Sequence, residues 1–234
     1  RDWSSDVCSS DLSCFAFNSK TQTWSINGTS AAPGIAWFQG NLEVGNGVYY
    51  NTFIASSNIT TAGGTSVYAP NYAGYSGRVD GVQYAPTGVC ENSYFPGLYP
   101  TDLCDKAGAK YLQTGLEGLG NYAMLAGSRS DENYADLASY VGGNITLGSS
   151  AYIYGSVKAG NEFTSGGSTT VHGYVTALAQ GTAAKNSMGG STTFDLRNLP
   201  KTMDPGGGKP GTPGTGGEST DPNAQVQVQW SRYL

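Results

Sequence analysis

The sequence is poor in charge: Asp, Glu, Lys and Arg make up 12% of its 234 residues, about half the usual share in a globular chain. It has one histidine, and no stretch reaches the roughly 18 consecutive apolar residues that a transmembrane helix needs. So little charge excludes the highly charged kind of disorder. A net charge of −5 leaves no surplus of Lys and Arg for binding nucleic acid or an anionic membrane.

Motifs of known catalytic and metal sites are missing as well. The sequence has no GxSxG, HExxH, Walker loop or CxxC pair. We expect the sole histidine, His172, to be a stacked surface residue and not a base. The carboxylates are scattered, whereas a glycosidase needs two in one cleft. Asp131, Glu132 and Asp136 are the best candidates for a cation site, with a solvated loop as the alternative. We therefore expect no enzyme activity, no cofactor and no metal.

Cysteines are few, and two of them suggest a disulfide. Cys90 and Cys104 enclose a loop rich in Pro, Gly and Tyr, and a bond closing about 15 residues would stabilise the fold by roughly 3 kcal/mol. A metal site would need further Cys or His ligands close by. We predict a Cys90–Cys104 disulfide, and hence an oxidising compartment. Cys14 is then either free or paired with a residue upstream.

The first twelve residues, RDWSSDVCSSDL, differ from the rest of the chain. They contain three acidic residues and no glycine, and they resemble the translation of a sequencing adapter. We set residues 1–12 apart as an artefact, with an unusual native N-terminus as the alternative. A signal peptide or membrane anchor could then precede Ser13 in the natural protein.

Glycine, in contrast, is abundant, with 35 residues, and it punctuates an internal repeat. Residues 40–64 align with residues 143–167 at an offset of 103, matching glycines and alternate apolar positions. A shorter repeat aligns residues 151–160 with residues 169–178 at an offset of 18. Matching of alternate apolar positions is harder to obtain by chance than matching of glycines.

The 18-residue repeat predicts the coils of a short single-stranded β-helix, or β-solenoid. Odd positions such as Ile153 and Val171 are apolar and even positions such as Tyr154 and His172 are polar or aromatic, as in a half-buried strand. In a solenoid each coil buries its inner face against the next. The alternative, a hairpin-built β-sandwich, gives no reason for identical parity at a fixed offset. The predicted fold is therefore mainly β, with a solenoid-like domain over residues 13–200.

Three further segments complete the predicted organisation. Residues 105–127 show helical spacing of apolar side chains interrupted by glycines, which predicts a short broken helix. Residues 201–222 form a linker rich in Gly and Pro, and residues 223–234 alternate as a C-terminal strand. That strand must return to the body or pair with another subunit.

Polar residues on the predicted coils have alternative interpretations. Asn27, Asn58 and Asn144 begin NxT triplets, which are glycosylation sites only if the source glycosylates them. We expect Asn58 and Asn144 to be structural, because they lie within the predicted coils. Thr-rich steps such as 60–61 and 169–170 suggest an ice-binding array. Outward positions mix Tyr, His and Lys with Thr, so we do not expect a regular array.

The repeat motifs resemble those of a bacterial type IV pilus-assembly family, the PilX-type minor pilin-like proteins. The segments that carry this resemblance are residues 34–75, the segment ending YPTDLC at Cys104, residues 118–127 and residues 141–177. The resemblance implies a non-enzymatic component of a surface fibre or of its assembly machinery. Members of that family carry an N-terminal hydrophobic helix that packs into the filament, and we expect the present reading frame to be truncated before it.

We therefore expect a structural or adhesive pilus-associated protein, located extracellularly, at the bacterial cell surface or in the periplasm. Its partners would be other pilin subunits or surface proteins and glycans, and membrane contact would occur only through the missing helix. One alternative is a secreted polysaccharide-active enzyme on a short β-helix, which needs several carboxylates and a basic residue in one groove. The other is a self-polymerising scaffold of bactofilin type, whose intracellular setting conflicts with a Cys90–Cys104 disulfide.

Overall fold

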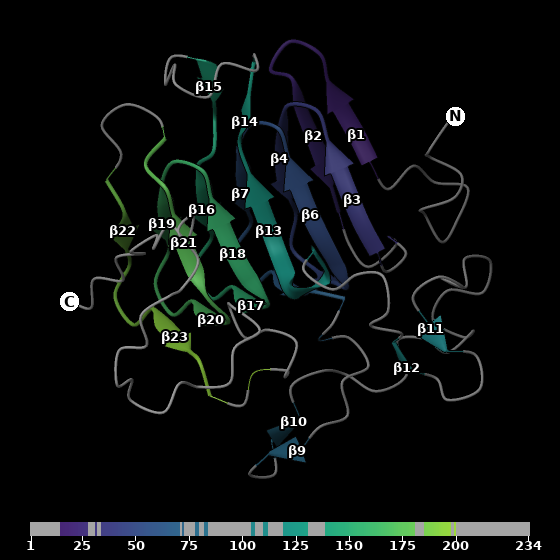
Figure 1. Cartoon of the computed structure of the whole chain (residues 1–234), viewed down its shortest axis with the longest axis vertical. Helices are drawn as coiled ribbons and strands as arrows, with labels where there is room; N and C mark the ends of the chain where they lie inside the picture. The colour runs from purple at the N-terminus through teal and green to yellow at the C-terminus, as the bar shows by residue number, and fades with distance from the viewer. Residues whose placement is uncertain are drawn as a thin grey trace, which may run out of the picture. The chain divides into compact units, whose positions relative to one another are not determined.

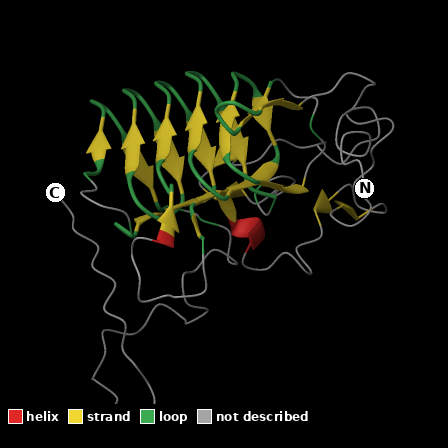
Figure 2. Ribbon diagram, turned by 90° about the horizontal axis from the view of Figure 1, so that it is seen from above, coloured by secondary structure: helices red, strands yellow, loops and turns green. Residues whose placement is uncertain are grey.

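Strands from successive turns of the chain lie side by side in three sheets, and each full turn adds one strand to each sheet in the same order (Figures 1 and 2). This three-sided β-helix confirms the predicted mainly β fold with a solenoid-like body. The structure is a computed structural model, and it describes residues 15–27, 31, 34–70, 72, 119–130, 139–180, 185–197 and 199, together with four short strands between residues 78 and 111.

The described residues all belong to the first of two compact units, Arg1–Asp204. The predicted linker over residues 201–222 and the predicted strand over residues 223–234 lie outside the described part of the chain, as does the adapter-like segment 1–12.

The three sheets have a simple strand order. Sheet I contains β1 (Phe15–Asn18), β2 (Thr23–Ile26), β4 (Asn41–Val44), β7 (Ile59–Thr61), β16 (Ile145–Leu147), β19 (Phe163–Ser165) and β22 (Ser187–Met188). Sheet II contains β5 (Val48–Tyr49), β8 (Ser66–Tyr68), β17 (Tyr152–Tyr154), β20 (Thr170–His172) and β23 (Thr193–Asp195). Sheet III, whose strands run side by side in Figure 1, contains β3 (Gly34–Phe38), β6 (Asn51–Ala55), β13 (Tyr122–Ala126), β18 (Ser156–Ala159) and β21 (Val175–Ala177). Pairing within these sheets is parallel except for the antiparallel β1–β2 hairpin.

Two insertions interrupt the coil formed by β7, β8 and β13. The first insertion, residues 69–121, contains the short pairs β9 (Arg78–Val79) with β10 (Val82–Gln83) and β11 (Cys104–Asp105) with β12 (Lys110–Tyr111), and it ends in the 3₁₀ turn η1 (Leu119–Asn121). The second insertion, residues 127–144, contains the antiparallel pair β14 (Ser128–Arg129) and β15 (Tyr140–Val141). Both insertions therefore leave the β-helix from a single turn.

The core consists of apolar rows that run from coil to coil. In sheet II the row is Tyr49, Val67, Ile153 and Val171, and each of these side chains is at most 1% exposed. Ile153 pairs directly with Val171, as the 18-residue repeat predicts. Burying one such side chain contributes roughly 1.5–3 kcal/mol. The stacking of coils therefore stabilises each coil through its neighbours.

The longer repeat is confirmed in sheet I and is wrong by one residue in sheet II. Leu42 pairs with Ile59, which pairs with Ile145, so the offset of 103 joins equivalent positions two coils apart. Three residues connect β4 to β5, whereas four connect β16 to β17. Because of this extra residue, Tyr49 and not Tyr50 lies in the row of Ile153.

The predicted strand over residues 151–160 is two strands on different sheets. β17 and β18 meet at a corner formed by Gly155. Val157 and Ala159 face inward beyond this corner as predicted, but Ser156, predicted to point outward, is buried beside it. Its hydroxyl accepts a hydrogen bond from the backbone N–H of Tyr174 in the next coil, at 3.3 Å.

The predicted helix over residues 105–127 is wrong where the structure describes it. Residues 119–121 form one 3₁₀ turn, and residues 122–126 form β13 between β6 and β18. Ala123 and Met124 are fully buried there. A strand paired on both sides satisfies its backbone groups and fills the core row, which outweighs the helical spacing of the sequence.

Corners between sheets I and II are built in the same way in several coils. The hydroxyls of Thr65 and Thr169 each lie within hydrogen-bond distance of two carbonyls, one three residues earlier and one in the preceding coil. The residue before Thr169, Ser168, has a φ of 58°, and Ser191 repeats this left-handed conformation one coil later. The signal for this last coil was the pentapeptide GGSTT, which occurs at 166–170 and again at 189–193.

Candidate functional site

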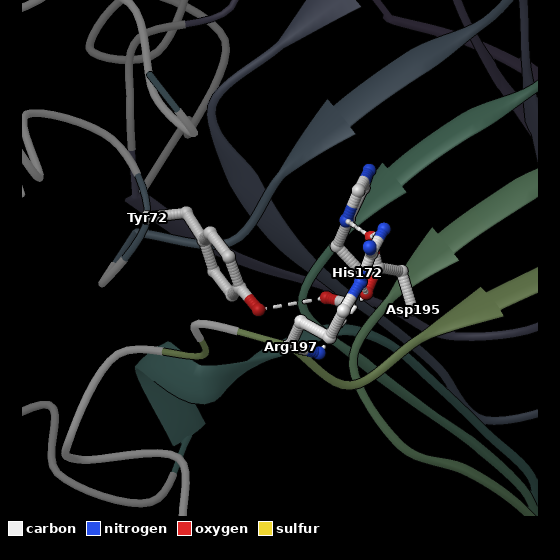
Figure 3. Close-up of polar contacts among 4 residues, drawn as sticks. All are labelled: Tyr72, His172, Asp195 and Arg197. Carbon is white, nitrogen blue, oxygen red and sulfur yellow. Dashed lines mark hydrogen bonds and ion pairs between the residues drawn. The ribbon is translucent and has the colours of Figure 1, made fainter. Parts of the chain in front are cut away.

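Three ionisable side chains meet where the last strands of sheet II end (Figure 3). His172 is the final residue of β20, and parallel pairing places it beside Asp195, the final residue of β23. Arg197 follows two residues later and folds back onto the Asp195 carboxylate. The sequence separates His172 from the other two by more than twenty residues, and only the coil geometry brings them together.

Arg197 holds Asp195 in its charged form. Its Nε and Nη2 donate to the two carboxylate oxygens at 3.0 and 2.9 Å, and its backbone N–H donates to Oδ1 at 3.0 Å. The side-chain hydrogen bonds from Arg197 lower the pKa of Asp195 to about 2. Asp195 is only 9% exposed, so this pairing neutralises a buried charge.

His172 is an uncharged ring at neutral pH. Its Nδ1 lies 3.5 Å from Oδ2 of Asp195. Burial lowers the pKa of His172 below 6.5, and this effect outweighs the opposite influence of the Asp195 carboxylate. The contact with Asp195 therefore does not make His172 a permanent cation.

Aromatic rings stack along the same edge of sheet II. Tyr50, Tyr68, Tyr154 and His172 follow one another with ring centroids 5.5, 4.3 and 4.6 Å apart. The last two pairs are nearly parallel, at 7° and 11°. The prediction that His172 is stacked is confirmed, but its side chain is only 15% exposed, so its predicted place at the surface is wrong. Tyr50 and Tyr68 were missed, although they are 18 residues apart, like Tyr154 and His172. The signal that joins Tyr68 to Tyr154 is the NIT triplet, which recurs at the same offset of 86 residues.

The first insertion begins by packing on this aromatic stack. Tyr72 is fully buried, and its ring meets that of Tyr154 edge-on with centroids 6.1 Å apart. Its hydroxyl donates to the backbone carbonyl of His172 at 2.7 Å (Figure 3). The stack therefore fastens the start of the insertion to sheet II. The role of the aromatic stack is therefore packing, and the charge of the neighbouring Asp195 is already neutralised by Arg197.

A pH dependence of stability should follow from His172, because it is the sole histidine of the chain. Its folded pKa is lowered, so between pH 6.5 and that lower pKa the unfolded state binds more protons than the folded state. The free energy of unfolding is then expected to fall as pH decreases from about 7.5 to about 5.5, above the range where carboxylates titrate. Urea unfolding of His172→Phe, which keeps an aromatic ring in the stack, should show little of this pH dependence.

The matched control for that measurement is Tyr154→Phe, which keeps both the stack and the histidine and should retain the pH dependence. An unchanged slope in His172→Phe would contradict the assignment to His172. Asp195 acts in a different range. Its stabilising contribution is complete above its ordinary pKa of about 3.8 and is lost as pH falls through about 2.

The other candidate site residues of the sequence lie in parts of the chain whose side chains the structure does not describe. Cys90, Asp131, Glu132 and Asp136 lie outside the described residues, and only the backbone of Cys104 is described, in β11. The Cys90–Cys104 disulfide therefore stays a prediction. Within the described part of the chain, no three His, Cys, Asp or Glu side chains gather in a way that could hold a metal ion.

Asparagines form a ladder at the corner that precedes sheet I. The Asn58 amide donates to Asn41 Oδ1 at 3.1 Å, and Asn58 Oδ1 accepts from the backbone N–H of Asn144 at 3.0 Å. Asn161 continues the ladder by donating to Asn144 Oδ1 at 2.8 Å. The expectation that Asn58 and Asn144 are structural is confirmed.

The outward face of sheet I carries one residue per coil, in register. The row is Ser25, Glu43, Thr60, Thr146, Thr164 and Ser187. The expectation that outward positions mix Thr with Tyr, His and Lys holds for sheets II and III but not for sheet I. Glu43 interrupts the hydroxyl row, so a continuous array extends over fewer than all of the coils.

Sheet III presents an apolar row over its first strands. Trp37 in β3 is 62% exposed, and it is followed in register by Ile54 and Leu125, and then by the exposed Lys158.

No helix in the described residues is long and apolar enough to cross a membrane. No family model matches the chain, and no similar protein was found among curated proteins or solved structures.

Proposed function

We propose that the chain is a non-enzymatic structural or adhesive protein of the bacterial cell surface, associated with a type IV pilus. The observation that carries the proposal is a β-helix whose repeated coils contain no known catalytic motif, combined with two long insertions that both depart from the same coil. Loops held on a rigid framework are the usual place for recognition. The β-helix would be the framework, and the insertions would make contact with pilin subunits, surface proteins or glycans.

The anchoring of the first insertion supports this role. Tyr72 fixes its start on the aromatic stack of sheet II. At its other end, the hydroxyl of the fully buried Thr52 contacts the carbonyls of Leu119 and Tyr122, at 3.1 and 2.6 Å. A segment of this length with both ends tied to a core can transmit force to the β-helix, as an adhesive contact requires.

The enzyme alternative receives no support from the described side chains. Asp195 is paired with Arg197, and His172 lies between the Tyr154 ring and that pair. A general acid or base has to reach a substrate atom, and these groups are already engaged with one another. The pilus setting itself rests on the resemblance of the strand and turn motifs.

The self-polymerising alternative is disfavoured by the ends of the described body. Sheet I begins with the extra strand β1, beyond β3 of sheet III, and it ends with β22, one strand beyond β21 of sheet III. Joining sheet III of two copies head to tail without a gap would place the β1–β2 hairpin of one copy on β19 and β22 of the other. A continuous filament of coils is therefore blocked in sheet I.

The test uses the bacterium that carries the gene. After deletion of the gene, the full-length gene and a version in which residues 73–118 are replaced by a short Gly-Ser linker are each restored. We expect antibody against the β-helix to label sheared surface fibres in both strains. Attachment to surfaces should return with the full gene and stay at the level of the deletion strain with the linker version. Replacing residues 131–138 in the same way tests the second insertion.

Three outcomes would contradict the proposal: recovery of the protein in the cytoplasmic fraction, normal attachment with both insertions replaced, or cleavage of a polysaccharide by the purified protein. Non-reducing peptide mapping tests the compartment separately. A Cys90–Cys104 linkage in protein taken from the native cell is the expected result, and free thiols at both positions would argue for the intracellular scaffold.

A further inference from the structure

The C-terminal end of the β-helix exposes side chains that occupy core positions. Phe194 continues the inward row of Val171 and packs against Phe163, and Met188 continues the row of the buried Ser165. Phe194 is nevertheless 41% exposed and Met188 is 51% exposed, because no further coil follows them among the described residues. Leu178 and Leu196, at the same end, are similarly exposed. This is the surface that the next coil of a solenoid would cover.

The N-terminal end is built differently. The β1–β2 hairpin brings Phe15, Phe17 and Trp24 together, and Phe15 and Trp24 also pack against Phe38, with centroids 5.5 and 6.1 Å away. The indole N–H of Trp24 donates to the carbonyl of Gln39 at 3.0 Å. A strand turned antiparallel also ends the parallel order of sheet I. One end therefore carries a cap of the kind that solenoids need, and the described residues form no such cap at the other end.

The C-terminal end also presents three strand edges at once. β22, β23 and β21 are the last strands of sheets I, II and III, and each pairs on one side only among the described residues. Free edges beside exposed apolar core positions favour strand addition. A second copy of this end supplies a strand for the free edge of β22, the last strand of sheet I.

We infer that two copies of the chain pair through their C-terminal ends about a two-fold axis, forming a closed dimer. Head-to-tail association is blocked by the β1–β2 hairpin, so association of like ends remains. With the axis through sheet I, β22 pairs antiparallel with the β22 of the second copy. The same rotation exchanges sheets II and III, so each β23 faces the shorter sheet III of the other copy. The contact is isologous and does not propagate. It does not depend on the pilus assignment.

The test measures the oligomeric state of the purified full chain by analytical ultracentrifugation at micromolar concentrations. We expect a dimer. Met188→Glu would bury a carboxylate in the contact and should raise the dissociation constant about 30-fold or more, the loss typical of a central interface residue. The matched control is Val141→Glu, which is 43% exposed on the second insertion and should leave the dimer intact. Circular dichroism checks that both variants fold.

A second measurement locates the contact without relying on destabilisation. Ser187→Cys places a thiol on β22 near the two-fold axis, and oxidation with oxidised glutathione should link two copies through that position, as identified by peptide mapping. Thr60→Cys, on the same face but away from the end, should not form such a link. A monomeric wild type, filaments, or a dimer insensitive to Met188→Glu would overturn the inference. So would a monomer that dimerises only when residues 205–234 are deleted, since its own tail would then cover the end.

Discussion

Replacing Ile153 by Ala should lower the free energy of unfolding by about 3 to 4 kcal/mol. Ile153 is fully buried in the middle of the sheet II row, between Val67 and Val171 of the neighbouring coils. The substitution removes three methyl or methylene groups and leaves a cavity that neighbouring coils cannot close, because their strand pairing fixes their spacing. Urea unfolding monitored by circular dichroism measures the loss.

Tyr152→Ala is the matched control for that substitution. Tyr152 lies one residue earlier in the same strand, points away from the core and is 45% exposed. It loses a larger side chain, yet the expected cost is below about 1 kcal/mol because little of that side chain is buried. Equal losses at the two positions would contradict a sheet with one face inside and one outside.

The inward rows could be predicted because their period is local. Alternation of apolar and polar residues in a three-residue strand, repeated after 18 residues, identifies Ile153 and Val171 as neighbours without knowledge of the remaining coils. The number of faces could not be predicted in this way. The inward alternation of Ile153, Val157 and Ala159 continues across the corner at Gly155, so the sequence looks like one longer strand in which Ser156 points outward.

The insertions account for the other errors. Tyr68 and Tyr154 are stacked neighbours, but the insertions lengthen their separation to 86 residues, so the 18-residue repeat does not reveal the pair, although the NIT triplets at 58–60 and 144–146 share that offset. Residues 122–126 have apolar spacing that suits a helix as well as a strand. Their strand conformation is selected by β6 and β18 on either side, which the sequence places far away.

The 18-residue repeat predicts the position of one residue of the candidate site and not the positions of the other two. His172 could be placed above Tyr154 because both belong to the 18-residue repeat. Asp195 and Arg197 belong to the last coil, in which the connection between sheets III and I is longer and the offset from β19 to β22 is 23 residues. The 18-residue repeat alone leaves Asp195 an isolated carboxylate, and the signal for its pairing with His172 is the GGSTT pentapeptide, which recurs at the same offset of 23.

Gly155→Ala should be at least as damaging as the loss of a core side chain, with an expected cost of about 3 kcal/mol or more. Gly155 forms the corner between β17 and β18 with a φ of 139°, a conformation that residues with a Cβ rarely adopt. A Cβ built there would lie 2.6 Å from the Cβ of Ala69 and 2.9 Å from the backbone nitrogen of Ala123. Both neighbours are fully buried and neither can rotate away.

Gly190→Ala provides the control for the same chemical change at another corner. A Cβ at Gly190 meets no atom within 4 Å, and its φ does not require glycine. The unfolding free energy should therefore change by less than about 1 kcal/mol, and a small gain would reflect the reduced freedom of the unfolded chain. Comparable losses in the two variants would mean that the corners are not the rigid elements described here.

The Gly155 variant also connects the framework to its proposed use. Ala69, which the new methyl group would strike, is the residue at which the first insertion leaves sheet II, and its N–H donates to the carbonyl of Tyr154 at 2.7 Å. Displacing Ala69 should weaken the contacts of Tyr72 with Tyr154 and His172. Limited proteolysis should then cut the insertion faster in Gly155→Ala than in Gly190→Ala, under conditions where both variants remain folded. Equal cleavage rates would mean that the Gly155 corner does not stabilise the insertion. The insertion would then be held on the β-helix through Thr52 alone.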